Sequence, residues 1–389
     1  MLLRQPFAPD ALDEVILGCV SPRADEVNPA RVAALRLGCG ERVTAWTVQR
    51  NCASGLQSVD TAWRYIADGR ADLVLAGGTE ALSHSPILYN DRMVDWLADL
   101  NLARGPVAKA KVATKWRPGF LSPVIGLLKG LTDPVVNLNM GQTAEVLAHR
   151  FSIDREEMDG FALESHKRTA KAQEAGHFAE IEPAFDARGR HYDRDDGVRP
   201  DNSMEQLAKL RPAFERPFGT VTPGNSSQIT DGAAWLILAS EDALKQHDLT
   251  PLARIVDGEW AALDPAQMGL GPVHASTPIL QRQQLDLDGI DVWEINEAFA
   301  AQVLACLKAW TDTDYCKEQL GLDKAMGALD RNRLNVDGGA ISIGHPVGSS
   351  GARIALHLVH VLKRLNAKRG IATLCIGGGQ GGALMMEAA

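Results

Sequence analysis

Residues 54–82 read SGLQSVDTAWRYIADGRADLVLAGGTEAL, and a similar arrangement returns near the end of the chain. There, SG at 350–351 opens the helical pattern ARIALHLVHVLKRL, and the strand-like IATLCIGGGQGGAL follows at 371–384. In both places a serine-glycine pair starts a helix, and a short apolar strand then ends in glycines. We interpret this as one supersecondary unit used twice, which predicts two related halves packed together. Chance similarity of two βα units is the alternative.

Short apolar runs, each followed by glycine or by a helical pattern, recur along the chain. The runs are DLVLAGG (72–78), AWLILAS (234–240), DVWEINEAF (291–299) and IATLCIGGG (371–379). Alternation of strand-like and helix-like segments predicts an α/β fold. The length of 389 residues suggests two or three domains at about 150 residues each.

The composition excludes several classes of protein. The net charge of −9 argues against a nucleic-acid-binding protein, which would normally be basic. No apolar run approaches the length of a membrane span, and the start, MLLRQPFAPDALDEV, predicts no signal peptide. The six cysteines are scattered and form no CxxC pair, so neither a metal site nor a disulfide framework is indicated. We expect reduced thiols and a cytoplasmic location.

A long insertion, 83–220, separates the two predicted halves. Between Leu100 and Thr132 it contains six Lys or Arg residues and no Asp or Glu, with large apolar residues among them. Such a stretch, here the basic segment 104–129, can lie on an anionic membrane surface or dock a partner protein. The alternative is a loop that folds over the core and turns its cations toward the phosphates of a ligand.

The cysteine in NCASG (51–55) stands between a strand-like and a helix-like run. An isolated cysteine is more often a buried core residue than a nucleophile. A nucleophile, however, benefits from the start of a helix, because that position lowers the pKa of a thiol and supplies free backbone N–H groups. The position of Cys52 therefore makes it a candidate nucleophile.

Three further polar or glycine-rich islands accompany this one: WEINEAFAAQ (293–302), NVDGGAISIGHPVGSSGAR (335–353) and CIGGGQGGALMME (375–387). Each alone could be a helix cap, a turn or a structural histidine. Together they offer a second thiol, a histidine in a glycine-rich loop and an Asn-Glu pair at a strand end. A nucleophile, a base and donors for an oxyanion are what acyl transfer through a thioester requires.

These islands resemble the motifs of the thiolase family, in the family's order: NCASG, NEAF, GGAISIGHPVGSSGAR and CIGGGQG. The resemblance covers nearly the whole chain. It implies the thiolase fold, with two similar βαβαβαββ halves stacked as an α-β-α-β-α sandwich and a loop domain inserted in the first half. We expect the N-terminal half at 1–82 and 221–250, the insertion at 83–220, and the C-terminal half at 251–389. The family's first strand is expected to be missing here.

The resemblance also implies catalytic roles by position. Cys52 matches the nucleophile that takes the acyl group, and His345 matches the base that activates it or the thiol of coenzyme A. Cys375 matches the acid/base that exchanges a proton with the α-carbon of acetyl-CoA. Asn296 matches the residue that holds a water in one oxyanion hole, and the N–H groups of Cys52 and Gly377 would form the other.

Three more positions match substrate-binding residues of the family. Ser227 matches a serine that lies along the pantetheine, and Arg199 falls where an arginine lies near the adenine of coenzyme A. Met140 matches a methionine that lines the acyl pocket. Coenzyme A and acyl-CoA are implied as substrates, with no permanently bound cofactor and no metal.

Two catalytic directions share these motifs. The insertion resembles that of the thiolase subunit of fatty-acid β-oxidation complexes, which favours a 3-ketoacyl-CoA thiolase with a hydratase/dehydrogenase partner. The alternative is an acetoacetyl-CoA thiolase that works in the condensing direction. A thiolase-like protein that binds acyl-CoA or lipid without catalysis is the third reading, and it would be marked by loss of a catalytic residue. The resemblance also implies a homodimer or homotetramer.

Overall fold

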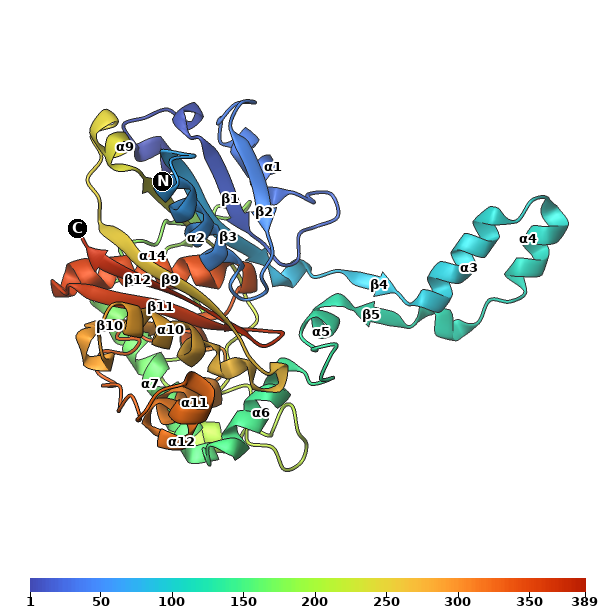
Figure 1. Ribbon diagram of the computed structural model, residues 1–389. Helices are drawn as coiled ribbons and strands as arrows, with labels where there is room; N and C mark the ends of the chain where they lie inside the picture. The colour runs from blue at the N-terminus through green and yellow to red at the C-terminus, as the bar shows by residue number, and fades with distance from the viewer.

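The computed structural model describes residues 1–389 and is built around two four-stranded sheets (Figure 1). The N-terminal sheet has the order β2-β1-β3-β8. Its strands are β1 (Glu14–Gly18), β2 (Thr44–Val48), β3 (Leu73–Ala81) and β8 (Asp231–Ala239). β1 runs parallel to β2 and β3, whereas β8 is antiparallel to β3.

The C-terminal sheet has the order β10-β11-β12-β9. Its strands are β9 (Ala253–Ala262), β10 (Val292–Ile295), β11 (Arg369–Ile376) and β12 (Gln380–Ala388). β10 and β11 are parallel, and β12 is antiparallel to both β11 and β9. β9 therefore covers the outer edge of β12, whereas β8 is an edge strand in the other sheet. The expected missing first strand would lie at the free edge of β8, and its absence stays a prediction.

Two helices, α2 (Ser54–Ala67) and α14 (Val347–Leu365), lie between the two sheets (Figure 1). They are the helices that the serine-glycine pairs predicted. They touch at glycines: a Cβ atom on Gly55 would lie 2.8 Å from the backbone nitrogen of Ala352, and one on Gly351 would lie 2.5 Å from that of Leu56. The backbones can approach so closely only because these residues have no side chain.

Further helices cover the outer faces of both sheets and complete the α-β-α-β-α layers. On the N-terminal sheet lie α1 (Pro29–Arg36) and α9 (Glu241–Gln246); the C-terminal side has α10 (Gly271–Arg282), α11 (Ala300–Thr311) and α12 (Thr313–Leu320). The strands serve two cores by alternation: in β1, Val15 faces the outer core and Ile16 the central one. The predicted thiolase-type sandwich is thus observed.

The insertion has a part that packs on the body and a part that projects from it. α6 (Met140–Arg150) and α7 (Arg155–Glu174) contribute Leu147, Met158 and Phe161 to the core of the C-terminal half. The smaller elements of this region are β6 (Ala184–Phe185), β7 (His191–Tyr192) and α8 (Met204–Ala208). A further short helix, α13 (Ala340–Ile343), precedes α14.

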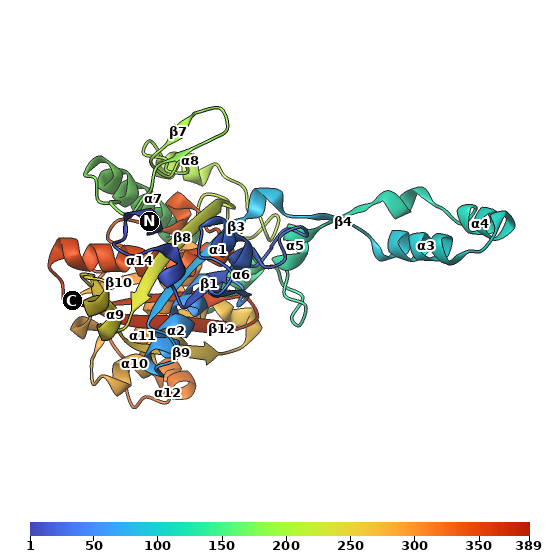
Figure 2. The same ribbon diagram turned by 90° about the horizontal axis from the view of Figure 1, so that it is seen from above.

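The projecting part, residues 87–130, forms an arm that extends away from the body in both views (Figures 1 and 2). It contains β4 (Ile87–Tyr89), α3 (Asp91–Leu102), α4 (Pro106–Ala113), β5 (Pro123–Ile125) and α5 (Gly126–Gly130). β4 pairs with β5, and the Trp96 indole donates to the carbonyl of Val112 at 2.9 Å. The basic segment therefore does not fold over the core. Among the described residues, none of the helices combines the length and apolarity that crossing a bilayer would require.

Candidate active site

Cys52 lies on a tight turn between β2 and α2. The residue before it, Asn51, has a φ of 43°, in the left-handed region that non-glycine residues rarely adopt. The Ser54 hydroxyl holds this turn: its oxygen accepts from the Arg50 N–H at 2.8 Å and donates to the Asn51 carbonyl at 2.7 Å. The local sequence thus places the Cys52 thiol at the start of α2 on a restrained backbone.

The glycine turn between β11 and β12 meets this thiol from the other half. The Asn51 side-chain amide donates to the Gly377 carbonyl at 2.8 Å, and the Gly377 backbone N–H interacts with Cys52. A Cβ atom on Gly377 would lie 3.2 Å from the Met140 sulfur. Cys375 is fully buried on β11, two residues before Gly377. The structure therefore brings together Cys52, Cys375, Gly377 and Met140.

The position of Cys52 at a helix start predicted a lowered pKa for its thiol, but the pKa values of both Cys52 and Cys375 are raised. Burial raises the pKa of Cys52, although the backbone N–H groups of Gly377 and of Cys52 itself act in the opposite direction. Burial also raises the pKa of Cys375 well above its ordinary value, with a further contribution from nearby Cys52. The expectation was wrong because desolvation of a thiolate outweighs the effect of the N–H groups at this buried site. Both groups are therefore thiols near neutral pH.

His345 is positioned to accept a proton. Its Nδ1 lies 2.6 Å from the Ser350 hydroxyl oxygen, and its backbone N–H donates to the Gln228 carbonyl at 2.9 Å. Burial, together with the charge of Arg353, lowers the pKa of His345 to about 4. The ring is therefore neutral at physiological pH. Its Nε2 is buried and has no hydrogen-bond partner among the described residues.

Asn296 presents a second unpaired polar group. It follows β10, is 1% exposed, and is fixed by its backbone N–H, which donates to the Thr373 carbonyl at 3.0 Å. This bond places Asn296 beside β11, at Thr373, which precedes Cys375 by two residues. Both its side-chain oxygen and nitrogen are buried without a partner among the described residues. Buried polar atoms are rarely left unpaired, so such atoms indicate a bound water or substrate oxygen.

The predicted coenzyme A residues lie on loops around this center. The Ser227 backbone N–H donates to the Ala298 carbonyl at 3.0 Å, which keeps Ser227 next to the strand end that carries Asn296. Arg199 is exposed on a surface loop, where its backbone N–H donates to His166 Nδ1 at 3.1 Å. Gln228 ties that loop to the His345 loop by donating to the carbonyls of Gly197 and Ser342. Ser227 is therefore joined to the strand end that carries Asn296, whereas Arg199 is an exposed residue of the loop that Gln228 holds.

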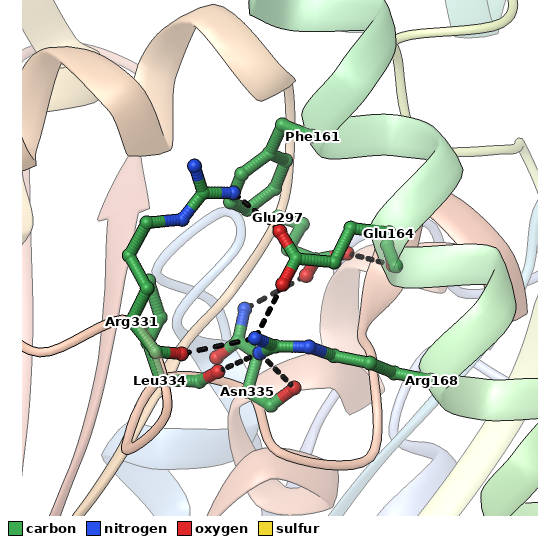
Figure 3. Close-up of a pocket in the computed structure, with 8 residues that line it drawn as sticks. Phe161, Glu164, Arg168, Glu297, Arg331, Leu334 and Asn335 are labelled. Carbon is green, nitrogen blue, oxygen red and sulfur yellow. Dashed lines mark hydrogen bonds and ion pairs between the residues drawn. The ribbon is translucent and has the colours of Figure 1, made fainter. Parts of the chain in front are cut away.

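Sequence reasoning missed the groups that hold these loops. The Glu297 carboxylate is buried and accepts from the Ser165 hydroxyl at 2.6 Å, the Asn335 amide at 2.8 Å and the Ile341 N–H at 3.2 Å. Figure 3 shows Glu297 and Asn335 in a small pocket that Arg168, Glu164 and Arg331 close from the outside. The NEAF motif drew attention to Glu297, but the hydrogen-bond partners of this carboxylate are distant in sequence and could not be predicted from it.

Comparison with known proteins agrees with the motifs. The family model described as "Thiolase, N-terminal domain" matches residues 1–242, and "Thiolase, C-terminal domain" matches residues 249–388. Together they account for nearly all of the chain.

Individual relatives are similar over the same length. A beta-ketoadipyl-CoA thiolase of Pseudomonas aeruginosa is 42% identical over 97% of this chain and 88% of its own. The mitochondrial trifunctional enzyme subunit beta of Rattus norvegicus is 37% identical over 100% of this chain and 81% of its own. The crystal structure of human mitochondrial 3-ketoacyl-CoA thiolase in complex with CoA superposes with a TM-score of 0.85 at 38% identity, covering 100% and 89% of the two chains.

Two similar halves with paired thiols at their junction define an acyltransferase architecture. The chain belongs to the thiolase family.

Proposed function

We propose that this protein is a 3-ketoacyl-CoA thiolase that uses coenzyme A to cleave a 3-ketoacyl-CoA into acetyl-CoA and a shortened acyl-CoA. One observation carries the proposal: Cys52, Cys375 and Gly377 meet at the junction of the halves. The buried side chains of Asn296 and His345 have atoms without a hydrogen-bond partner among the described residues, which supports roles for them in binding an oxyanion and moving a proton. The names of the relatives support the proposal, because they include ketoacyl-CoA and ketoadipyl-CoA thiolases.

In the first half-reaction, the Cys52 sulfur attacks the 3-keto carbon while the thiol proton passes to neutral His345. The bond between carbons 2 and 3 then breaks, which leaves the shortened acyl group on Cys52 and the enolate of acetyl-CoA. Cys375 gives its proton to carbon 2 and becomes a thiolate. A water held by Asn296, together with His345, stabilises the enolate oxygen as charge develops, and each such donor contributes a few kcal/mol.

In the second half-reaction, the thiol of a new coenzyme A attacks the acyl group on Cys52. Its proton passes to the Cys375 thiolate, and Cys52 leaves and recovers its proton from His345. The backbone N–H groups of Cys52 and Gly377 stabilise the tetrahedral oxyanion. The high pKa of Cys375 suits this part, because a basic thiolate accepts the proton readily.

Substrate binding follows from the loops around the thiols. We assign Ser227 to the path of the pantetheine and Met140 to the acyl side; the bond from Ser227 to Ala298 and the closeness of Met140 to Gly377 support these roles. Arg199 is exposed and cationic, which suits a contact near the adenine end of coenzyme A. Coenzyme A and acyl-CoA are substrates in this proposal, and no permanently bound cofactor is needed.

The decisive experiment is coenzyme-A-dependent thiolysis of acetoacetyl-CoA and of 3-ketohexadecanoyl-CoA with the same purified protein. Preference for the long chain supports the degradative reaction of β-oxidation. Preference for acetoacetyl-CoA instead supports the alternative acetyl-CoA C-acetyltransferase that condenses two acetyl-CoA molecules. Absence of turnover on both, with no acyl group trapped on Cys52, contradicts the proposed catalysis and supports a non-catalytic protein that binds acyl-CoA or lipid.

We further propose that the arm docks on an anionic membrane surface. The arm carries seven Lys or Arg residues against three aspartates, all three in α3, although the whole chain has a net charge of −9. Between Leu100 and Thr132 there are six cations and no anion. Large apolar side chains of the arm are exposed, including Leu102 at 75% and Val107 at 82%. Basic and apolar groups on a projecting element suit the boundary of anionic lipids. A hydratase/dehydrogenase subunit is the other candidate partner, and a lack of vesicle binding would favour it.

The oligomeric state and the cellular compartment of the protein are proposed from the family resemblance and from its cysteines. We propose a homodimer or homotetramer, because the family resemblance implies one. The six cysteines are free in the structure, which fits a reducing, cytoplasmic compartment. Sedimentation analysis and localisation of a tagged protein would test the two statements separately.

A further inference from the structure

Glu80 is a buried carboxylate that joins the two halves of the molecule. It lies near the end of β3 in the N-terminal half and is only 2% exposed. Its oxygens accept from the N–H groups of Val20 and Ser21, both at 3.0 Å, in the loop after β1. They also accept from the Gly348 N–H at 2.9 Å, in the first turn of α14 in the C-terminal half.

The bond to Gly348 replaces a cap that α14 does not have. The helix begins after Pro346, which offers no side-chain hydrogen bond to the free N–H groups of the first turn. A carboxylate at this end accepts a hydrogen bond from one of these N–H groups and interacts favourably with the positive end of the helix dipole. The fit is close: a Cβ atom on Gly348 would lie 2.6 Å from the Thr79 carbonyl oxygen and 2.8 Å from Glu80 Oε2.

The same helical turn holds the proposed base. Ser350 lies in it, and its hydroxyl oxygen is 2.6 Å from His345 Nδ1 and 3.2 Å from the Pro346 carbonyl oxygen. A shift of the first turn of α14 would therefore move Ser350 and rotate the imidazole. Glu80 also stands close enough to Cys52 for its charge to raise the pKa of that thiol, after the larger effect of burial.

We propose that Glu80 is a positioning residue for the thiolase reaction: by capping α14 from the opposite half, it fixes Ser350 and His345 relative to Cys52. The role rests on the proposed function, because it presumes that His345 exchanges a proton with the Cys52 thiol. Glu80 does not touch the substrate in this proposal. It acts through the first turn of α14, and it keeps a negative charge near the nucleophile.

The test is Glu80→Gln, which keeps the shape but removes the charge and one acceptor. We expect the kcat of thiolysis to fall about tenfold or more, while the KM for coenzyme A changes less than about threefold. The rate of Cys52 alkylation by iodoacetamide should rise at a lower pH than in the wild type, because the repelling charge is gone. Peptide mapping must follow Cys52 itself, because the buried Cys19 thiol also donates to Glu80 at 3.8 Å and loses that neighbour in the same variant. A residue that only supports folding would lower thermal stability without moving this pH profile.

Two further variants keep the result decisive. Glu182→Gln is the matched control, because Glu182 is an exposed glutamate paired with Arg4, and it should leave both readouts unchanged. Glu80→Asp keeps the charge but shortens the reach, so it should lower kcat while leaving the alkylation profile in place. A folded Glu80→Gln protein with wild-type kcat overturns the proposal. If that variant does not fold, wild-type kcat in Glu80→Asp overturns it.

The alkylation measurement also separates this proposal from the proposed function. It reports on Cys52 in the absence of any substrate. A wild-type protein with no thiolase activity would contradict the proposed function, whatever the alkylation profile. An active wild type in which Glu80→Gln changes neither kcat nor the profile would contradict only the role of Glu80.

Discussion

The side-chain amide of Asn51 donates a hydrogen bond to the carbonyl oxygen of Gly377 at 2.8 Å, across 326 residues of sequence. Asn51 precedes the candidate nucleophile, and Gly377 belongs to the glycine turn that follows Cys375. The bond therefore fixes the two thiol-bearing motifs relative to each other. It also uses the left-handed conformation of Asn51, which points the amide across the junction of the halves.

Replacing Asn51 with alanine should reduce both catalysis and stability. Loss of one hydrogen bond of about 1–1.5 kcal/mol would allow the Gly377 N–H to move, so we expect kcat for thiolysis to fall about tenfold. The left-handed backbone should add about 1 kcal/mol of destabilisation. Asn137→Ala is the control, since Asn137 is exposed and also has a positive φ, 56°. It should lose only the backbone contribution of about 1 kcal/mol, with unchanged turnover, and equal kcat in both variants would refute the link.

The two thiols should separate into two chemical steps. Cys52→Ser should abolish trapping of a radiolabelled acetyl group on the protein, because the nucleophile is lost. Cys375→Ala should keep that labelling but lose condensation of two acetyl-CoA molecules, since no group remains to move the α-proton. Cys39→Ala, a buried cysteine in the outer core of the N-terminal half, should change neither step. Labelled Cys52→Ser protein, or condensation by Cys375→Ala, would show that the roles are misassigned.

The fold was predictable because its signals are local in sequence. Glycine-ended apolar strands and the two serine-glycine helix starts are short patterns, and both helices and both sheets formed where they indicated. Family motifs then supplied candidate residues, and Cys52, Cys375, Gly377 and Met140 do meet in the structure.

The supporting interactions were not predictable, because each joins residues that are distant in sequence. Glu80 bonds to Gly348 and Glu297 bonds to Ser165, and no spacing rule connects either pair. The pKa of Cys52 was predicted in the wrong direction, since a helix start is visible in sequence whereas the depth of burial is not. The positive charge of the basic segment 104–129 could be read from the sequence, but its projection from the body could not (Figure 2).

A buried histidine on α14 should make stability fall at alkaline pH. Burial alone would lower the pKa of His357, but its bonds to Asp337 and Glu180 outweigh burial and raise it to about 9. Nδ1 lies 2.5 Å from Glu180, and Nε2 lies 3.3 Å from Asp337. The folded pKa is above the unfolded one, so this stabilisation is complete below about pH 6.5 and is lost as the pH rises through about 9.

His357→Gln should therefore lower the free energy of unfolding by about 3 kcal/mol at pH 6, the size of a pKa shift from 6.5 to about 9. The loss falls mainly on the pair with Glu180, because Asp337 keeps Arg364 as a partner. The substitution should also flatten the decline of stability between pH 6.5 and 9, the interval between the unfolded and folded pKa values. Urea denaturation across this range measures both effects. His191→Gln, at an exposed position, is the control. An unchanged slope in His357→Gln would assign the decline to other groups.

The proposal for the arm predicts a charge-dependent interaction with lipid. Replacing Lys109, Lys111 and Lys115 with glutamine removes three exposed cations, each worth about 1 kcal/mol at an anionic surface. Cosedimentation with phosphatidylglycerol-phosphatidylcholine vesicles should weaken by roughly 100-fold. The matched control replaces Lys245, Lys317 and Lys324, which are exposed on the body. Equal loss in both triple variants would indicate only nonspecific attraction, and wild-type protein that stays in the supernatant would rule out the membrane surface.

Substitution by alanine should have opposite effects at two helical glycines: Gly55, in the contact between α2 and α14, and Gly160, which faces open space on α7. Gly55→Ala would place its Cβ 2.9 Å from the Gly348 carbonyl oxygen as well as 2.8 Å from the Ala352 nitrogen, so the helices must separate. Overpacking of this kind costs about 1–3 kcal/mol. Separation would also shift the start of each helix, where Cys52 and His345 lie, so activity should fall with stability.

Gly160→Ala on α7 should instead stabilise the protein, by about 0.5–1 kcal/mol, because a Cβ there meets nothing within 4 Å and alanine favours the helix. Its thiolysis should equal that of the wild type. Thermal melts and thiolysis rates of the two single variants test the pair directly. A Gly55→Ala protein with wild-type stability and rate would show that the two helices can separate without cost, and that the position of the thiol and the imidazole does not depend on their close contact.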